Sequence, residues 1–187
     1  MKLIGIVGNN ANRSYNRTLL QYMAKHFAND VELEVREIGQ LPMFNENLMK
    51  AVPEAVTELM TAIEVADGVV IATPEYDHSI TACLKSCLEW LSCVGHPLTD
   101  KPVMIVGASL GQQGTSWDQT QLREILNSPG INAQVLPGNQ FMLSFASQKF
   151  DEQGQMTDAR TVEFLEKCFG SFQRFVQTNR ETQLALA

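Results

Sequence analysis

Short apolar runs that alternate with segments of helical period restrict the fold of this chain more than any other feature. Residues 2–8 (KLIGIVG), 68–72 (GVVIA) and 101–109 (KPVMIVGAS) are apolar almost throughout, which is typical of strands buried on both faces of a parallel sheet. Residues 31–38 (VELEVREI) instead alternate between apolar and charged side chains, as in an edge strand with one wetter face. Residues 131–137 (INAQVLP) are a shorter, fifth candidate strand.

Segments of helical period lie between and after these strands. Apolar residues recur every three or four positions in residues 17–27, 52–66, 80–91, 117–126 and 158–176. Strands that alternate with helices predict an α/β fold with a doubly wound, five-stranded parallel sheet, and right-handed crossovers favour the strand order 2-1-3-4-5. We expect one domain over residues 1–178 and a frayed tail over residues 179–187, where no apolar pattern is sustained.

Charge and hydropathy exclude several classes of partner. The chain has 187 residues and a net charge of -7, so we expect neither nucleic acid nor an anionic membrane surface as a partner. The first apolar run is too short for a signal peptide, and no stretch reaches the roughly 18 apolar residues of a membrane span. We therefore expect a cytoplasmic protein.

The four cysteines form no C-x-x-C pair. Cys83 and Cys87 share one helix face, and Cys93 and His96 follow closely, so a metal site is one interpretation of this segment. Small buried thiols that pack a core helix are the favoured interpretation. We expect no metal.

Polar loops follow the first, third and fourth predicted strands. Their sequences are GNNANRSYN, TPEYDHS and GASLGQQGTS. In an open parallel sheet, ligands bind outside the carboxyl ends of the strands, at the point where the strand order reverses. The three loops are therefore expected to meet at one ligand site.

The first loop has the composition of a phosphate site. Asn9, Ser14 and Asn16 bring amides and a hydroxyl to a helix N-terminus, where backbone N–H groups also favour an anion; helix capping is the alternative interpretation. The loop is neither G-x-G-x-x-G nor G-x-x-x-x-G-K-[ST], which disfavours dinucleotide and P-loop sites. A phospho-receiver domain would need acidic residues after this strand, where the chain has Gly8 and Asn9.

The other two loops suit a flat ligand. Tyr76 offers a face for stacking, and the backbone of residues 75–77 can hydrogen-bond to a ring edge; a surface aromatic is the alternative interpretation. Glycines at positions 107, 111 and 114 allow a close approach of the backbone to a ring, although they could also serve only to close the turn.

Three segments together resemble the NAD(P)H-dependent FMN reductase family, which includes quinone, chromate and azo-dye reductases. The segment TPEYDHSITACLKSCLEWL is similar to the family's TPEYN-x-S-I-P-x-x-L-K-N-x-x-x-W, and GNNANRSYN to its G-S-x-R-x-x-S-x-N phosphate loop. The segment KPVMIVGASLGQQGTSWDQTQLR is similar to KPV-x-x-x-G-A-S-x-G-x-x-G-x-x-x-x-Q-x-x-L-R. The resemblance covers residues 1–135. It implies a flavodoxin-like fold, non-covalently bound FMN, NADPH or NADH as co-substrate, and a homodimer or homotetramer.

The resemblance also implies a set of cofactor-binding residues. The phosphate would be bound by Ser14, Asn16 and Asn9, the last of which stands where the family usually has Ser. The flavin ring would lie between one segment with Pro74, Glu75, Tyr76 and Asp77 and another with Ser109, Gly111 and Gly114.

Three positions depart from the family pattern. Ala11 stands where the family often has Arg, so that Arg13 or Arg17 would have to supply a cation. Thr81 replaces a Pro at the helix start, and Asp77 replaces an Asn. Two interpretations of Asp77 stay open: a carboxylate near the ring that disfavours flavin reduction, or a cap for the following helix.

The implied function is an FMN-dependent NAD(P)H oxidoreductase that reduces a small-molecule electron acceptor such as a quinone, an azo compound or free flavin. No side chain need act as acid or base, because the flavin carries the chemistry. A flavodoxin-type electron carrier without a nicotinamide site is the alternative, and a flavin-free binding or regulatory subunit is a third interpretation. Apolar residues of the helix over 80–91 (Leu84, Leu88, Trp90, Leu91) are candidates for a subunit interface.

Overall fold

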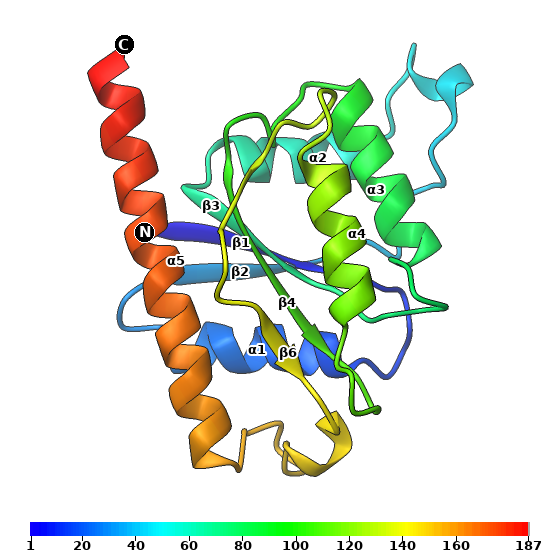
Figure 1. Ribbon diagram of the computed structural model, residues 1–187. Coiled ribbons are helices and arrows are strands. Elements are labelled where there is room, and N and C mark those ends of the chain that lie inside the picture. Colours follow the sequence, from blue (N-terminus) through cyan, green and yellow to red (C-terminus); the bar gives the residue numbers. More distant parts are fainter. Residues whose placement is uncertain (187) are drawn as a thin grey trace.

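A parallel β-sheet lies between two layers of helices (Figure 1). The computed structural model describes residues 1–186. The strands are β1 (Lys2–Val7), β2 (Glu32–Glu37), β3 (Gly68–Ala72), β4 (Pro102–Ala108), β5 (Gln134–Val135) and β6 (Phe141–Leu143). The helices are α1 (Tyr15–His26), α2 (Glu54–Glu64), α3 (Ala82–Cys93), α4 (Ser116–Leu126) and α5 (Ala159–Leu186), with short 3-10 turns η1 (Glu46–Leu48) and η2 (Ala146–Gln148).

The predicted strand order is confirmed. The sheet runs β2-β1-β3-β4-β5 with every pairing parallel, which is the flavodoxin-like arrangement. Strand β1 pairs with β2 on one side and with β3 on the other, so the strand order reverses beside its carboxyl end. Strands β1, β3 and β4 are buried almost throughout, as their apolar sequences predicted, whereas β2 has partly exposed residues.

The sheet packs against its helices through two apolar cores, one on each face. Helices α1 and α5 cover one face, and α2, α3 and α4 cover the other (Figure 1). Alternate residues of β1 show the division, since Leu3 and Val7 pack toward α1 and α5 while Ile4 and Ile6 pack toward α2 and α3. In residues 1–186 no helix is both long enough and apolar enough to cross a bilayer.

The fifth strand differs from the prediction. Instead of one strand over residues 131–137, two short strands, β5 and β6, pair with different parts of β4. The chain leaves the sheet between them because Pro137 has no N–H to donate, and because Gly138 and Asn139 have positive φ angles of 61° and 45°. Strand β6, which sequence periodicity missed, continues the sheet to the carboxyl end of β4.

The last helix is longer than predicted. Helix α5 continues to Leu186, so residues 179–186 are helical rather than frayed, and only Ala187 lies outside the described residues. The segment has good helix formers and no Gly or Pro, which explains the continuation. Two contacts tie it to the body: Arg180 lies 3.7 Å from Asp67, and the Gln183 side chain donates to the Asp100 carbonyl.

The apolar residues of α3 are core residues. Leu84, Leu88, Trp90 and Leu91 are each at most 1% exposed, and the Trp90 indole N–H donates to the Pro42 carbonyl at 2.8 Å. The interpretation of these side chains as a subunit interface is therefore wrong, because α2, the sheet and the loop before α2 already cover them.

Candidate functional site

A cavity of about 500 Å³ opens at the carboxyl ends of β1, β3 and β4. Its size is typical of a small-molecule site. The three polar loops line it together: Asn9, Arg13, Ser14, Tyr15 and Asn16 from the first, Pro74, Glu75 and Tyr76 from the second, and Ala108, Ser109, Leu110, Gly111, Gln112, Gln113 and Gly114 from the third. Nine of the ten predicted site residues are in this lining, and only Asp77 is not.

The phosphate loop presents an unsatisfied buried amide to this cavity. Asn9 is 4% exposed, and its Oδ1 has no hydrogen-bond partner among the described residues. A buried polar group without a partner is costly, which fits a ligand that completes its bonding. Ser14 caps α1 by accepting a hydrogen bond from the Arg17 N–H at 3.2 Å, and the first-turn N–H groups beside it have no partner within the helix.

Asn16 holds the loops together through its side chain. Its Nδ2 donates to the Ala108 carbonyl at 3.0 Å, and its Oδ1 accepts from the Ala108 N–H at 2.9 Å. Both ends of this buried carboxamide are thus committed to the last residue of β4. This bonding fixes the first loop against the end of β4, and the phosphate contact that the sequence suggested for Asn16 stays a prediction.

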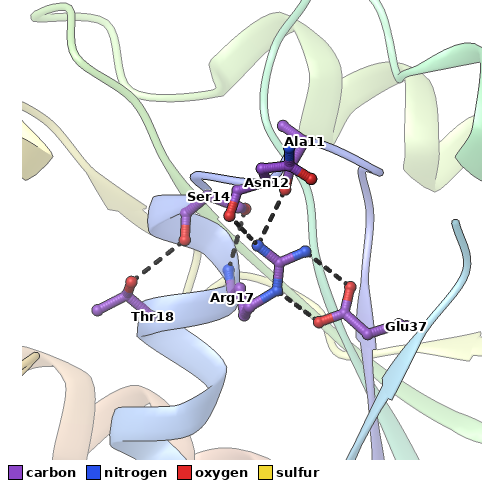
Figure 2. Close-up of polar contacts among 6 residues, drawn as sticks. All are labelled: Ala11, Asn12, Ser14, Arg17, Thr18 and Glu37. Atoms are coloured by element: carbon purple, nitrogen blue, oxygen red, sulfur yellow. Dashed lines mark hydrogen bonds and ion pairs between the residues drawn. The ribbon is translucent and has the colours of Figure 1, made fainter.

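The two arginines considered as substitutes for the family arginine at Ala11 lie in different surroundings. The Arg17 guanidinium donates to the carbonyls of Ala11 and Asn12 and to the Glu37 carboxylate (Figure 2), and Arg17 is not in the cavity lining. Arg13, by contrast, lines the cavity. Of the two arginines proposed from the sequence, Arg13 is the one in position to meet an anion.

Asp77 occupies a tight turn rather than a helix cap. The N–H groups and carbonyls of Tyr76 and Ser79 bond reciprocally at 3.0 Å, and the two residues between them, Asp77 and His78, have φ angles of 51° and 60°. Two positive φ angles characterise a type I′ turn, in which Asn and Asp are favoured, so Asp can replace the family's Asn there. Helix α3 is capped instead by Thr81, which accepts from the Leu84 N–H and donates to the Gly8 carbonyl at 2.7 Å. The capping interpretation of Asp77 is wrong.

Glu75 links the second loop to the third. Its Oε2 accepts hydrogen bonds from the N–H groups of Trp117 and Asp118, at 3.0 and 3.3 Å. Thr115, at the N-cap of α4, makes no side-chain cap bond of its own within the described chain, so the Glu75 carboxylate caps this helix from another loop. The second loop is thereby held against the N-terminus of α4.

A buried carboxyl lies beneath this connection. Asp118 is 0% exposed, its Oδ1 accepts from the Thr73 hydroxyl at 3.1 Å, and its Oδ2 has no partner among residues 1–186. Burial raises the pKa of Asp118 to about 7; the Thr73 hydrogen bond lowers it and the neighbouring charge of Glu75 raises it further. The sequence offered no signal for this group, since Asp118 reads as an ordinary first-turn residue of a helix.

The third loop leaves room for a ligand. A Cβ on Gly111 would meet nothing within 4 Å, so packing does not require glycine there, whereas one on Gly114 would lie 2.9 Å from Met142 at a φ of +66°. The segment after β6 braces the loop, because the Ser144 hydroxyl donates to the Gln112 carbonyl and the Phe145 N–H to the Gly111 carbonyl. This support, like β6 itself, was missed by the sequence analysis.

The thiol segment does not assemble into a metal centre in the described part of the chain. No group of three or more His, Cys, Asp or Glu side chains in residues 1–186 is placed to hold an ion. Cys87 is a buried packing residue, and burial raises the pKa of its thiol to about 12. Cys93 is exposed, so the expectation of buried thiols is wrong for that position.

Together the cavity residues fit a phosphorylated flat ligand. The N-terminus of α1, Ser14 and Arg13 bring hydrogen-bond donors and a cation to the lining, and the unsatisfied Oδ1 of Asn9 is an acceptor for a ligand hydroxyl or N–H. Tyr76, 51% exposed, stands at the rim. These are the groups that FMN would need: hydrogen-bond donors for its phosphate and an open, partly aromatic slot for its ring.

Comparisons with known proteins agree with this site. The NADPH-dependent FMN reductase family matches residues 1–148. An NADH:(hydroxy)cinnamate reductase subunit of Vibrio ruber is 46% identical over 95% of this chain and 88% of that protein, and subunit 2 of an NADH-dependent flavin reductase of Lactobacillus johnsonii is 44% identical over 95% and 98%. The solved structure of FerB, a flavoenzyme NAD(P)H:(acceptor) oxidoreductase of Paracoccus denitrificans, shares the fold with a TM-score of 0.87 at 24% identity, covering 95% of this chain and 98% of FerB. The chain belongs to the NADPH-dependent FMN reductase family.

Proposed function

We propose that this FMN-dependent NAD(P)H oxidoreductase works in the cytoplasm, binds FMN between its three loops and reduces a flat small molecule, such as a quinone, an azo compound or free flavin. The observation that carries the proposal is the cavity of about 500 Å³ that the three loops line together at the N-terminus of α1. Its lining includes the Oδ1 of Asn9, which is unsatisfied in the described chain and can accept a hydrogen bond from a hydroxyl or ring N–H of FMN. The alternative of an electron carrier is less favoured, because the relatives at 46% and 44% identity are named as an NADH:(hydroxy)cinnamate reductase subunit and an NADH-dependent flavin reductase subunit.

Each loop has a distinct part in this proposal. Asn9, Arg13 and Ser14, with the first-turn N–H groups of α1, would bind the phosphate. The segments 74–76 and 109–114 would hold the ring from its two sides. FMN, when bound, supplies the two-electron chemistry. The chain itself orients the reactants, and because the site is open to solvent, water can supply protons without a dedicated acid.

Anaerobic reduction tests the function directly. The purified protein saturated with FMN should be yellow, and NADH or NADPH should bleach the flavin absorbance within seconds to minutes without oxygen. Subsequent addition of a quinone should restore the colour. A yellow protein that neither nucleotide bleaches would indicate an electron carrier, and a protein that stays colourless after gel filtration with FMN would indicate a flavin-free subunit.

A second candidate function is electron donation to a protein partner. It is favoured by the names of the two relatives at 46% and 44% identity, which are both described as subunits. Leu110 and Trp117, exposed by 64% and 56%, flank the cavity region and would suit contact with another protein. In the reduction experiment, a protein with this function would have its flavin bleached rapidly by NADH or NADPH, and every small-molecule acceptor would reoxidise the flavin only slowly.

We also propose that the protein is a homodimer. The loop over residues 39–53 projects beyond α3 (Figure 1) and exposes Met43, Leu48 and Met49 by 63%, 38% and 42%. Exposed apolar side chains clustered on one loop favour burial against a second subunit. Light scattering at micromolar concentration should give twice the chain mass of 20.8 kDa, and Met43→Glu should shift the mass toward that of the monomer. A monomeric wild-type protein would contradict the proposal.

A further inference from the structure

The phosphate loop is held by a side chain that is not part of the cavity lining. We propose that Arg17, braced by Glu37, is a positioning residue that holds residues 11–13 in the shape that binds the FMN phosphate. The inference rests on the proposed function, since it assumes that the phosphate lies in this loop. It assigns a role to a side chain that lines no part of the cavity.

The guanidinium links the carbonyls of the first loop to Glu37, which lies 20 residues after Arg17 in the sequence (Figure 2). Its Nε and Nη2 donate to the two carboxylate oxygens of Glu37 at 2.5 and 2.9 Å. Its Nη1 donates to the carbonyls of Ala11 and Asn12 at 2.9 and 3.2 Å. Four of its five N–H donors are therefore used. Because the guanidinium is planar and its N–H directions are fixed, the bonds to Glu37 also fix the direction in which Nη1 meets the loop carbonyls.

This arrangement sets the direction of the loop's N–H groups. In a trans peptide the carbonyl and the following N–H point in opposite directions, and the chain has no cis peptide. With the carbonyls of Ala11 and Asn12 turned to the guanidinium, the N–H groups of Asn12 and Arg13 turn away from it. Arg13 and Ser14 line the cavity while Arg17 and Glu37 do not, so the guanidinium holds the loop without being part of the cavity wall.

Arg17 is not itself placed as a phosphate ligand. Glu37 neutralises its charge, and its hydrogen bond to Glu37 raises the pKa of Arg17. The side chains of the pair are 22% and 43% exposed, so solvent and salt screen their attraction. If Arg17 only stabilised the fold, replacing it would change the affinities for FMN and riboflavin alike. If it positions the phosphate loop, replacing it should weaken the binding of FMN and leave the binding of riboflavin unchanged.

FMN and riboflavin, which differ only in the phosphate, separate these roles. We expect Arg17→Met to weaken FMN binding about tenfold, equivalent to about 1.4 kcal/mol, and to change riboflavin binding less than about twofold. Dissociation constants would be measured by flavin fluorescence titration. Arg17→Lys keeps the positive charge but loses the planar set of N–H donors, so it should weaken FMN binding by nearly as much.

Glu37→Gln gives results of opposite sign for the two possible roles. If Arg17 is a positioning residue, removing its brace lowers FMN affinity; if it attracts the phosphate as a free cation, losing the Glu37 charge raises FMN affinity. Arg36→Met is the matched control, because Arg36 forms a comparable pair with Glu34 on the same strand at 2.5 Å. It should leave the affinity for both flavins unchanged.

The wild-type titration distinguishes failure of this inference from failure of the proposed function. If wild-type protein binds riboflavin as tightly as FMN, the phosphate site itself is absent from this loop. If wild-type protein prefers FMN and both Arg17→Met and Arg17→Lys keep that preference, Arg17 is a surface ion pair and the inference is overturned.

Discussion

Replacing Ser14 with aspartate should lower FMN affinity at least about 100-fold while leaving helix α1 in place. Ser14 lines the cavity and caps α1 through the Arg17 N–H. Asp caps a helix about as well as Ser, so the change adds a charge without removing the cap. At about 4 Å and an effective dielectric of about 20, a carboxylate repels each phosphate charge by about 4 kcal/mol. A loss of about 2.7 kcal/mol is already a factor of 100.

Riboflavin and Ser14→Ala are the controls for this prediction. Riboflavin has no phosphate, so its affinity for the Ser14→Asp protein should stay within about a factor of three of the wild-type value. Ser14→Ala removes the cap, which should cost about 1 kcal/mol of stability, but it introduces no repulsion. Fluorescence titration and urea unfolding measure the two effects. Unchanged FMN affinity in the Asp variant would exclude the first loop from the phosphate site.

Wild-type protein should lose about 2 to 4 kcal/mol of stability through Asp118 as the pH rises from 4 to 8, and Asp118→Asn should abolish this loss. The folded protein raises the pKa of Asp118 from its ordinary value of 3.8 to about 7, chiefly through burial. Between these two pH values the unfolded chain has released the proton and the folded protein keeps it. The folded state therefore binds more protons, and the free energy of unfolding falls as the pH rises through this range, then levels off above about 7.

The magnitude follows from the two pKa values. At 1.36 kcal/mol per pH unit, the difference between 3.8 and about 7 amounts to at most about 4 kcal/mol. Asn has nearly the same shape but does not ionise, so its contribution should not depend on pH. The stability of Asp118→Asn relative to wild type should thus increase from pH 4 to pH 8.

Urea unfolding of both proteins at several pH values checks this result. The relevant quantity is the change in the stability difference with pH, because any pH-independent effect of the new amide cancels. Glu124→Gln, at an exposed position of the same helix, is the matched control and should show no such change. A constant difference between wild type and Asp118→Asn from pH 4 to pH 8 would show that Asp118 ionises normally in the folded protein.

The position of the site could be predicted from local sequence because of the geometry of parallel sheets. Buried strands of this kind are recognised by apolar runs, and their carboxyl ends meet at one edge. Loops far apart in the chain, such as those beginning at Gly8, Thr73 and Gly107, were therefore expected to converge. The structure places all but Asp77 of the predicted residues around one cavity.

The partners of individual side chains could not be predicted in the same way. Arg17 was a candidate phosphate ligand from its sequence position, yet Glu37, brought alongside by the pairing of β1 with β2, engages it instead. Glu75 was predicted to lie along the flavin ring, and the structure adds that its carboxylate caps a helix 42 residues further along the chain. Such contacts depend on which elements become neighbours, and periodicity carries no information about that choice.

By itself, the sequence determined the order of the sheet, the location of the site and the family to which the chain belongs, because burial patterns and loop motifs are local properties. Only the tertiary structure decided what covers the apolar face of α3, where the fifth strand breaks, and which polar groups stay unsatisfied. Leu91 has the same sequence pattern whether it packs in a core or at an interface. It is only 1% exposed because elements distant in the chain cover it. The raised pKa of Asp118 has the same origin, since desolvation is produced by packing and not by neighbouring residues in the sequence.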